Sequence, residues 1–277
     1  MTFLESVVLG LAQGLSEFLP ISSSGHLALL EYFFGIDEDR VLFFAALLHL
    51  GTLFSIFFVY HKEIWALLRE LGAVFADLFA GRGPRVNANE TRRLGFMILV
   101  ATVPTALVGL FLRDLFSELY GSLVAVGAGL LITGSMMFVS ERMARGARDL
   151  PDLRFAHAFF VGVMQSIALC PGISRSGATI TGGLASGMKR ELAVRFAFLI
   201  SIPSVIGAIL LEAPEAFAAG AAGATLPSLG AGVAVAMLSG FFAIKAMIRV
   251  VSLGRLRCFS FYTWALGAAV IAYALFL

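Results

Sequence analysis

The amino-acid sequence predicts an all-α polytopic membrane protein. We expect about six transmembrane helices plus two re-entrant helical hairpins, arranged as an inverted-topology repeat. Three observations lead to this fold class. Hydrophobic residues make up 59% of the chain and charged residues only 14%. A polar motif recurs without a gap 152 residues later, and the basic residues sort onto one side of the predicted membrane.

The repeated motif lies near the start of each half of the chain. Its first copy, residues 13–26, reads Gln-Gly-Leu-Ser-Glu-Phe-Leu-Pro-Ile-Ser-Ser-Ser-Gly-His. A shift of 152 residues places Gln13 on Gln165, Ser22 on Ser174, Ser24 on Ser176 and Gly25 on Gly177. Such repeats are typical of transporter-type folds. We therefore divide a single membrane domain into a first repeat, 1–150, and a second repeat, 151–277.

The first repeat opens with two short apolar segments, 3–19 and 22–34, separated by Pro20. Each is too short to cross a hydrocarbon core of about 30 Å, which takes about 20 helical residues. Together they predict a re-entrant hairpin that is buried in protein or faces water. Full crossings follow over 41–60, 94–112 and 120–140. We expect a polar loop over 61–93 and an Arg-rich loop over 141–155.

The second repeat follows the same plan. Segments 156–170 and 175–187, joined through Pro171 and Gly172, predict another hairpin. Crossings are expected over 191–211, 227–248 and 260–277. The Ala- and Gly-rich run 216–224 is expected to be a connector.

Charge distribution orients this arrangement. If each hairpin returns to its own side, one face receives fifteen basic residues: Lys62, Arg69, Arg82, Arg85, Arg92, Arg93, Arg142, Arg145, Arg148, Arg154, Lys189, Arg190, Arg249, Arg255 and Arg257. The other face receives two, Arg40 and Arg113. By the positive-inside rule the first face is cytoplasmic. Both termini then lie outside the cytoplasm, and the two repeats are inverted relative to each other.

The first hairpin carries polar groups that are costly within a bilayer. Gln13 and Glu17 are four residues apart, so they share one face of a helix. A buried hydrogen-bonding pair would explain Gln13. The carboxylate of Glu17 needs a cation, a proton or a metal, so both a divalent ion and a catalytic proton are reasonable.

A run of three serines, Ser22, Ser23 and Ser24, opens the second segment of this hairpin. A serine at a helix start is most often a cap. Three hydroxyls beside free backbone N–H groups also form an anion cradle. His26 can share a helix face with Ser22 or Ser23, which suits either a satisfied core histidine or acid–base work.

The second hairpin adds a fixed positive charge. Ser174, Arg175 and Ser176 again open a helix, and a guanidinium fork suits phosphate geometry. Equivalent positions of an inverted repeat tend to meet near the midplane. One hairpin would then supply carboxylate, hydroxyl and imidazole, and the other a cationic clamp. This combination favours phosphoryl transfer to or from a lipid.

Three motifs carry a family resemblance. They are Gln-x-x-x-Glu (13–17), Pro-Ile-Ser-Ser-Ser-Gly-His (20–26) and Pro-Gly-Ile-Ser-Arg-Ser-Gly-Ala-Thr (171–179). In these motifs, and in length and segment order, the chain resembles the bacterial undecaprenyl-diphosphatases, the bacitracin-resistance phosphatases. The resemblance implies hydrolysis of undecaprenyl diphosphate to the monophosphate and phosphate, aided by Mg²⁺ or Ca²⁺, at the bacterial plasma membrane.

From the residues and the resemblance together we expect catalysis by Ser23, His26 and Glu17, phosphate binding by Arg175, Ser22, Ser24, Ser174, Ser176 and Thr179, and metal binding by Glu17 and Gln13. Many members of the family have a second glutamate where this sequence has Gln13, which weakens a two-carboxylate metal site. Ser24 stands where some members have Thr. The attacking group is either Ser23 or a metal-bound water.

Two other functions fit part of the pattern. A transporter or flippase for a phosphorylated lipid would use the same repeated, broken-helix architecture. An intramembrane serine protease would need no phosphate clamp, so Arg175 counts against it. We expect a polyprenyl diphosphate lipid and the membrane as partners and no nucleic acid. The sequence leaves open whether the chain forms a homodimer.

Overall fold

The computed structural model describes residues 2–35, 38–143, 146–219 and 225–276, and this part of the chain is helical almost throughout. The elements are α1 (Phe3–Phe18), α2 (Ser23–Phe34), α3 (Glu38–Val59), α4 (His61–Phe79), α5 (Glu90–Phe111), α6 (Arg113–Tyr120), α7 (Leu123–Met143), a 3-10 turn (Leu150–Asp152), α8 (Phe155–Ile167), α9 (Arg175–Ala185), α10 (Arg190–Ala219), α11 (Leu226–Ser252) and α12 (Arg257–Phe276).

Five helices of the described chain are long and apolar enough to cross a membrane: α5, α7, the Arg190–Leu211 part of α10, α11 and α12. A sixth span is reached if Phe43–Val59 of α3 and α4 are counted as one, although these two segments meet at 90°. The expectation of a polytopic helical membrane protein is thereby confirmed, with five or six candidate spans.

The four helices of the two predicted hairpins are shorter than a crossing requires. α1, α2, α8 and α9 have 16, 12, 13 and 11 residues, and at 1.5 Å per residue none of them spans a core of about 30 Å. Local sequence explains their ends. Thr2 caps α1 in a capping box with Glu5, and α2 stops at Gly35, whose φ of 61° suits glycine.

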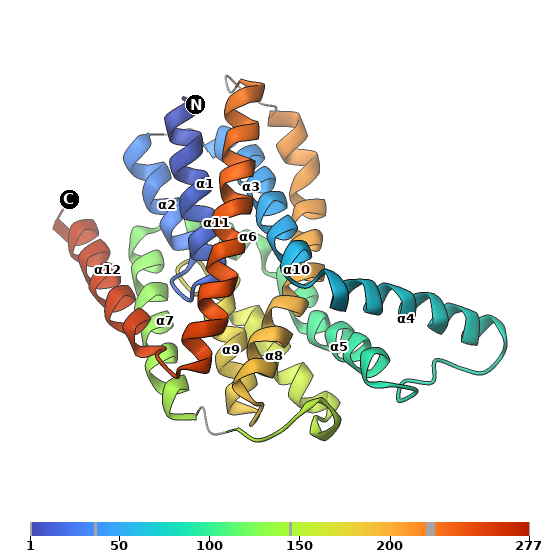
Figure 1. Ribbon diagram of the computed structural model, residues 1–277. Helices are drawn as coiled ribbons and strands as arrows, with labels where there is room; N and C mark the ends of the chain where they lie inside the picture. The colour runs from blue at the N-terminus through green and yellow to red at the C-terminus, as the bar shows by residue number, and fades with distance from the viewer. Residues whose placement is uncertain (1, 36–37, 144–145, 220–224, 277) are drawn as a thin grey trace.

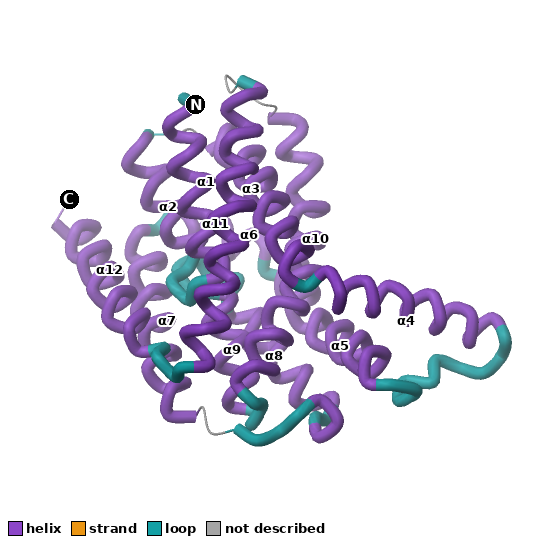
Figure 2. Tube along the Cα trace, in the orientation of Figure 1, coloured by secondary structure: helices purple, strands orange, loops and turns teal. Residues whose placement is uncertain are grey.

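The two short pairs approach each other from opposite ends of the molecule. In Figure 1, α1 and α2 lie in the upper part of the view and α8 and α9 in the lower part. The turns within the pairs are the loops at mid-height in Figure 2. The predicted hairpin segments therefore match the observed helices to within about three residues.

Glycines allow helices from different halves of the chain to pack closely. A Cβ atom at Gly10 of α1 would collide with the backbone of Gly232 in α11, and one at Gly162 of α8 would collide with the backbone of Ala101 in α5. Gly10 and Gly162 are 152 residues apart in sequence. Each first helix of a pair is thus fixed against a long helix.

The largest cluster of buried hydrophobic residues includes side chains from α1, α5, α8, α9 and α10. Phe18, the last residue of α1, is buried and packs edge-on against Phe198 of α10, with ring centroids 5.5 Å apart. This contact fixes the end of α1, and therefore its neighbour Glu17, at the centre of the molecule.

Two predictions were wrong in whole or in part, the loop 61–93 and the connector 216–224. The predicted loop 61–93 contains α4, a helix of 19 residues, and the first turn of α5. Charged and apolar residues are interspersed along α4, so the segment resembles a polar loop until the apolar residues are seen to recur at helical spacing. The interval after Phe111 contains α6, and α10 continues through Pro214 to Ala219. Arg145 and residues 220–224 of the predicted connector lie outside the described residues.

Candidate active site

The turns of the two short helix pairs are held together by reciprocal hydrogen bonds. The backbone N–H of Gly172 donates to Ser24 Oγ over 3.3 Å, and the hydroxyl of Ser176 donates to the Leu19 carbonyl over 3.3 Å. The serine two residues past each cap thus reaches across to the other turn. This arrangement brings together motifs that are 152 residues apart in the sequence.

Each second helix of a pair begins with the same serine arrangement. Ser22 caps α2 by accepting from the N–H of Gly25 at 3.2 Å, and Ser174 caps α9 by accepting from the N–H of Gly177 at 3.2 Å. Each capping hydroxyl also contacts the serine two positions on, Ser24 at 3.1 Å or Ser176 at 3.2 Å. Two helix N-termini, each carrying a partial positive charge, therefore meet at one place.

Ser22 adopts an unusual backbone conformation. Its φ of 71° lies in the left-handed region, where a serine costs about 1–3 kcal/mol relative to a relaxed backbone. This conformation turns the chain sharply between Pro20 and α2, so the next residue, Ser23, points back towards α1. Strain of this kind clusters at functional sites.

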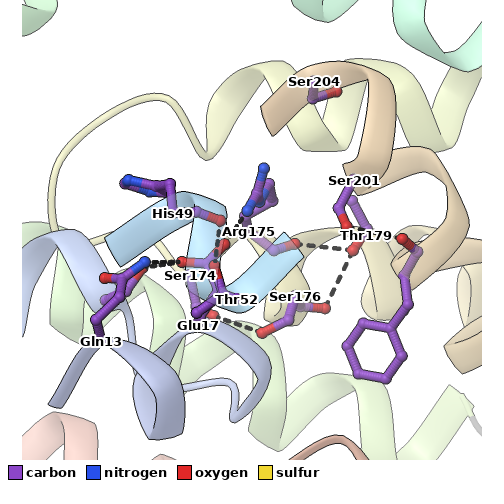
Figure 3. Close-up of polar contacts among 12 residues, drawn as sticks. Gln13, Glu17, His49, Thr52, Ser174, Arg175, Ser176, Thr179, Ser201 and Ser204 are labelled. Carbon is purple, nitrogen blue, oxygen red and sulfur yellow. Dashed lines mark hydrogen bonds and ion pairs between the residues drawn. The ribbon is translucent and has the colours of Figure 1, made fainter. Parts of the chain in front are cut away.

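Glu17 is the centre of the site. Its carboxylate is buried, with 4% of the side chain exposed. Oε2 accepts hydrogen bonds from Gln13 Nε2 at 3.1 Å and from the Ser23 hydroxyl at 2.6 Å, while Oε1 forms an ion pair with Arg175. Figure 3 shows Gln13 and Arg175 converging on this carboxylate. Three helices, α1, α2 and α9, thus contribute to one polar cluster.

Arg175 neutralises Glu17 and keeps capacity for another anion. Its side chain is 23% exposed, so the guanidinium reaches the surface of the cluster. Glu17 is the one side chain in the described chain to which the guanidinium is bonded. An arginine has five N–H donors, and several of them remain for a phosphate group. The charge-assisted fork of arginine is well suited to this ligand.

His26 does not contact the Ser23 hydroxyl. Nδ1 lies 2.7 Å from the Ser22 carbonyl oxygen, and Nε2 lies 2.6 Å from the hydroxyl of Tyr262 in α12. The imidazole and phenol rings stack, with centroids 5.7 Å apart. Because a carbonyl only accepts, Nδ1 carries a hydrogen. In the neutral ring Nε2 therefore accepts from the tyrosine O–H.

Tyr262 is a site residue that the sequence does not indicate. It lies 236 residues after His26, inside an apolar segment that reads as an ordinary membrane span. No local motif surrounds it, and the repeat offers no equivalent contact. Only the packing of α12 beside α2 and α7 makes the tyrosine visible as a partner of the imidazole.

The other predicted phosphate ligands are bonded within the protein. Thr179 donates to the Arg175 carbonyl at 2.8 Å within its own helix, and Ser174 and Ser176 are buried and bonded to each other. Figure 3 shows Thr179 and Ser176 along the start of α9. These groups shape the helix N-terminus, while Ser23 and Arg175 present the more accessible polar atoms.

The donor set suits a hard cation such as Mg²⁺ or Ca²⁺. Gln13 Oε1 is buried and has no hydrogen-bond partner in the described chain, and it lies on the same side chain whose amide donates to Glu17. Amide and carboxylate oxygens are typical ligands of these ions. The described residues contain no group of three or more His, Cys, Asp or Glu that could hold a metal. An ion here would need further oxygens from water or phosphate.

Comparisons with known proteins agree over nearly the full length. The family model for "Bacitracin resistance protein BacA" matches residues 6–269. The undecaprenyl-diphosphatase of Alkaliphilus metalliredigens is 46% identical over 275 residues, which cover 99% of this chain and 100% of the relative. The enzymes of that name from Desulforapulum autotrophicum and Carboxydothermus hydrogenoformans are 42% and 40% identical, each over at least 96% of both chains.

Proposed function

The chain belongs to the BacA family of bacitracin resistance proteins and is an undecaprenyl-diphosphatase, and from this premise we propose that the cluster around Glu17 and Arg175 is its active site. The enzyme converts undecaprenyl diphosphate to undecaprenyl phosphate and inorganic phosphate. The diphosphatase expectation is thus confirmed over the transporter and protease alternatives. One observation carries the choice of site: a single buried carboxylate is bonded both to a serine hydroxyl and to a guanidinium.

Substrate binding would exchange the partner of Arg175. The terminal phosphate brings more negative charge than the carboxylate of Glu17, and it can accept two parallel N–H bonds from the guanidinium. The N-termini of α2 and α9 add backbone N–H groups and dipoles of the same sign. These groups stabilise the charge that spreads over the phosphoryl oxygens during transfer.

We assign the nucleophile to Ser23 and the base to Glu17. The Ser23 oxygen bonds to the terminal phosphorus while the bond from that phosphorus to the bridging oxygen breaks, and undecaprenyl phosphate leaves. The hydroxyl proton passes to Glu17, whose Oε2 lies 2.6 Å from the Ser23 oxygen. Water then attacks the phosphoserine, Glu17 returns its proton to the serine oxygen, and phosphate leaves carrying both hydrogens of the water. Direct attack by water, with Glu17 as base, is the competing route.

This assignment gives His26 a positioning role. Its two ring nitrogens are engaged by the Ser22 carbonyl and the Tyr262 hydroxyl, so it holds the first turn of α2 in place. Gln13 and Glu17 would hold a divalent cation, Mg²⁺ or Ca²⁺, which when bound would offset the negative charge of the diphosphate.

We also propose the finer membrane arrangement. In it, α1–α2 and α8–α9 are re-entrant hairpins, and each repeat, 1–150 or 151–277, adds three crossings. The half-length helices and their opposite directions of entry in Figure 1 support this arrangement. The fifteen-to-two sorting of basic residues places 61–93 and 141–155 in the cytoplasm and both termini outside.

Single-cysteine labelling tests the topology. A chain lacking Cys170 and Cys258 receives one cysteine by Arg85→Cys in the exposed 80–89 loop. A membrane-impermeant maleimide should label it only after the cells are opened. Labelling from outside intact cells would overturn the inverted arrangement.

Phosphate release tests the site. Purified protein in detergent, with no ion gradient, should release phosphate from undecaprenyl diphosphate, and Glu17→Gln should suppress this release by about 10²–10⁴-fold. Near-normal release by Glu17→Gln would move the active site elsewhere in the fold.

A further inference from the structure

Helix α4 leaves the body of the molecule at a right angle to α3. The two helices are separated only by Tyr60 and are bent by 90°. Figure 1 shows α4 extending sideways from the helix bundle, with α5 folding back beneath it. If α3 crosses the bilayer, α4 runs parallel to the plane of the membrane.

The exposed face of α4 is apolar. Trp65, Leu68, Phe75 and Phe79 recur at helical spacing and are 60%, 49%, 53% and 89% exposed. Because the stripe continues over four turns beyond the bundle, it is not part of the protein core. A continuous stripe of this kind is the mark of a helix that lies in the membrane–water interface.

Two carboxylates of α4, Glu70 and Asp77, are turned inwards and neutralised. Arg92 of α5 is buried and donates to Glu70 Oε2 at 2.8 Å and to Asp77 Oδ2 at 2.7 Å. Asn89 binds the other oxygen of Glu70 at 2.9 Å. This network fixes α4 against α5, so the apolar stripe has a defined orientation.

Two cations flank the apolar stripe at the start of the helix. Lys62 and Arg69 are exposed, lie on one side of α4 two turns apart, and form no ion pair within the described chain. Glu70, the carboxylate beside Arg69 in sequence, is already held by Arg92. Trp65 lies between the two cations along the helix.

A cavity of about 580 Å³ opens at the same place. Its lining includes Phe57, Trp65 and Leu68 as well as Lys62 and Arg69. Apolar walls beside two unpaired cations complement a molecule with an acyl chain and a negative phosphate. A neutral lipid would leave both cations without a partner.

We propose that the elbow between α3 and α4 is a binding site for an anionic phospholipid of the bilayer. The phosphate lies between Lys62 and Arg69, and an acyl chain packs on Phe57, Trp65 and Leu68. Each cation near an anionic membrane surface contributes about fivefold in affinity, so the pair contributes on the order of twenty-fivefold. This site is separate from the Glu17 cluster and does not depend on how the reaction proceeds.

Fluorescence of Trp65 offers a direct test. The chain has two tryptophans, so Trp264→Phe leaves Trp65 as the single reporter. The protein is reconstituted in vesicles of phosphatidylcholine and phosphatidylglycerol in which one lipid carries brominated chains, which quench tryptophan on contact. The two quenching series give the relative affinity of the two lipids at the elbow. We expect phosphatidylglycerol to be preferred on the order of twenty-fivefold.

Matched variants identify the source of that preference. Lys62→Gln with Arg69→Gln should bring the affinity ratio close to one. Arg249→Gln with Arg255→Gln removes the same charge from exposed positions of the other repeat, and should leave the ratio unchanged. Diphosphatase turnover should persist in both, which confirms folding.

Three outcomes would overturn the proposal. They are no quenching by either lipid, equal quenching by both in the parent, and a preference that survives Lys62→Gln with Arg69→Gln. The indole of Trp264 donates to the Leu131 carbonyl, so Trp264→Phe could impair folding. Native mass spectrometry of lipid adducts on the parent chain and the two double variants then makes the same comparison.

Discussion

The hydroxyl of Ser23 donates a 2.6 Å hydrogen bond to the carboxylate of Glu17, although the two residues belong to different helices. The positive φ of Ser22 and the turn after Pro20 make this contact possible, because they direct the start of α2 back towards the end of α1. A nucleophile within hydrogen-bond reach of its base is the pattern of covalent catalysis.

Replacement of Ser23 separates covalent catalysis from attack by water. Ser23→Ala should reduce turnover by more than the 10²–10⁴-fold typical of losing a general base, because both the nucleophile and its proton are removed. Ser22→Ala is the comparison: it removes a helix cap worth about 1 kcal/mol of stability but leaves the Ser23 hydroxyl and Glu17 in place, so turnover should fall far less than in Ser23→Ala. Steady-state turnover of detergent-purified variants with matched circular dichroism gives the ranking. Substantial activity in Ser23→Ala would favour a water nucleophile.

The value of kcat/KM should depend on the shape of the side chain at position 175 as well as on its charge. Arg175→Lys keeps a positive charge but loses the planar fork. A lost hydrogen bond to a charged group costs roughly 1.5–3 kcal/mol, or about tenfold to 150-fold in kcat/KM. Because a lysine can still pair with Glu17, we expect the fold to remain intact, as judged by thermal stability in detergent. Normal kcat/KM in this variant would show that the guanidinium serves only to neutralise Glu17.

Much of this site follows from sequence alone. Helix-breaking Pro20 and the Pro171–Gly172 pair divide apolar segments that are too short to cross a bilayer, so both hairpins are predictable. The meeting of Glu17 with Arg175 follows from treating the two copies as halves of one repeat. Local rules suffice because each motif combines a turn, a cap and a short apolar run.

Other features depend on tertiary packing. The partner of His26 is chosen by the docking of α12, which no local pattern reveals, and helical spacing alone wrongly suggests that the imidazole faces Ser22 or Ser23 side chains. The apolar residues of α4 recur at helical spacing, but the pairing of Glu70 and Asp77 with Arg92 of another helix is not visible in the sequence. Long-range contacts, unlike turns and caps, leave no periodic trace in one sequence.

Loss of the Tyr262 hydroxyl should slow turnover. Tyr262→Phe keeps the stack on His26 but removes one hydrogen bond, worth about 1 kcal/mol, so turnover should fall about fivefold. Tyr273→Phe, a hydroxyl loss on the same helix, is the matched control and should have little effect. If His26 only positions α2, His26→Gln should lower kcat with KM nearly unchanged. Equal turnover of Tyr262→Phe and the parent would remove Tyr262 from the positioning network.

Gln13 offers a test of metal binding. Its Nε2 donates to Glu17, so the amide stabilises the carboxylate without adding charge. Gln13→Glu would place two carboxylates one helical turn apart, and their repulsion would favour occupation of the site by a divalent cation. We expect Mg²⁺ or Ca²⁺ to bind more tightly to Gln13→Glu than to the parent in calorimetry without substrate. After chelation, Gln13→Glu should also need a lower concentration of Mg²⁺ or Ca²⁺ than the parent to reach half-maximal activity. Gln13→Ala is the counterpart, since it removes the unpartnered oxygen and should weaken cation binding. Identical cation affinity in all three proteins would show that neither Gln13 nor its carboxylate replacement is a ligand.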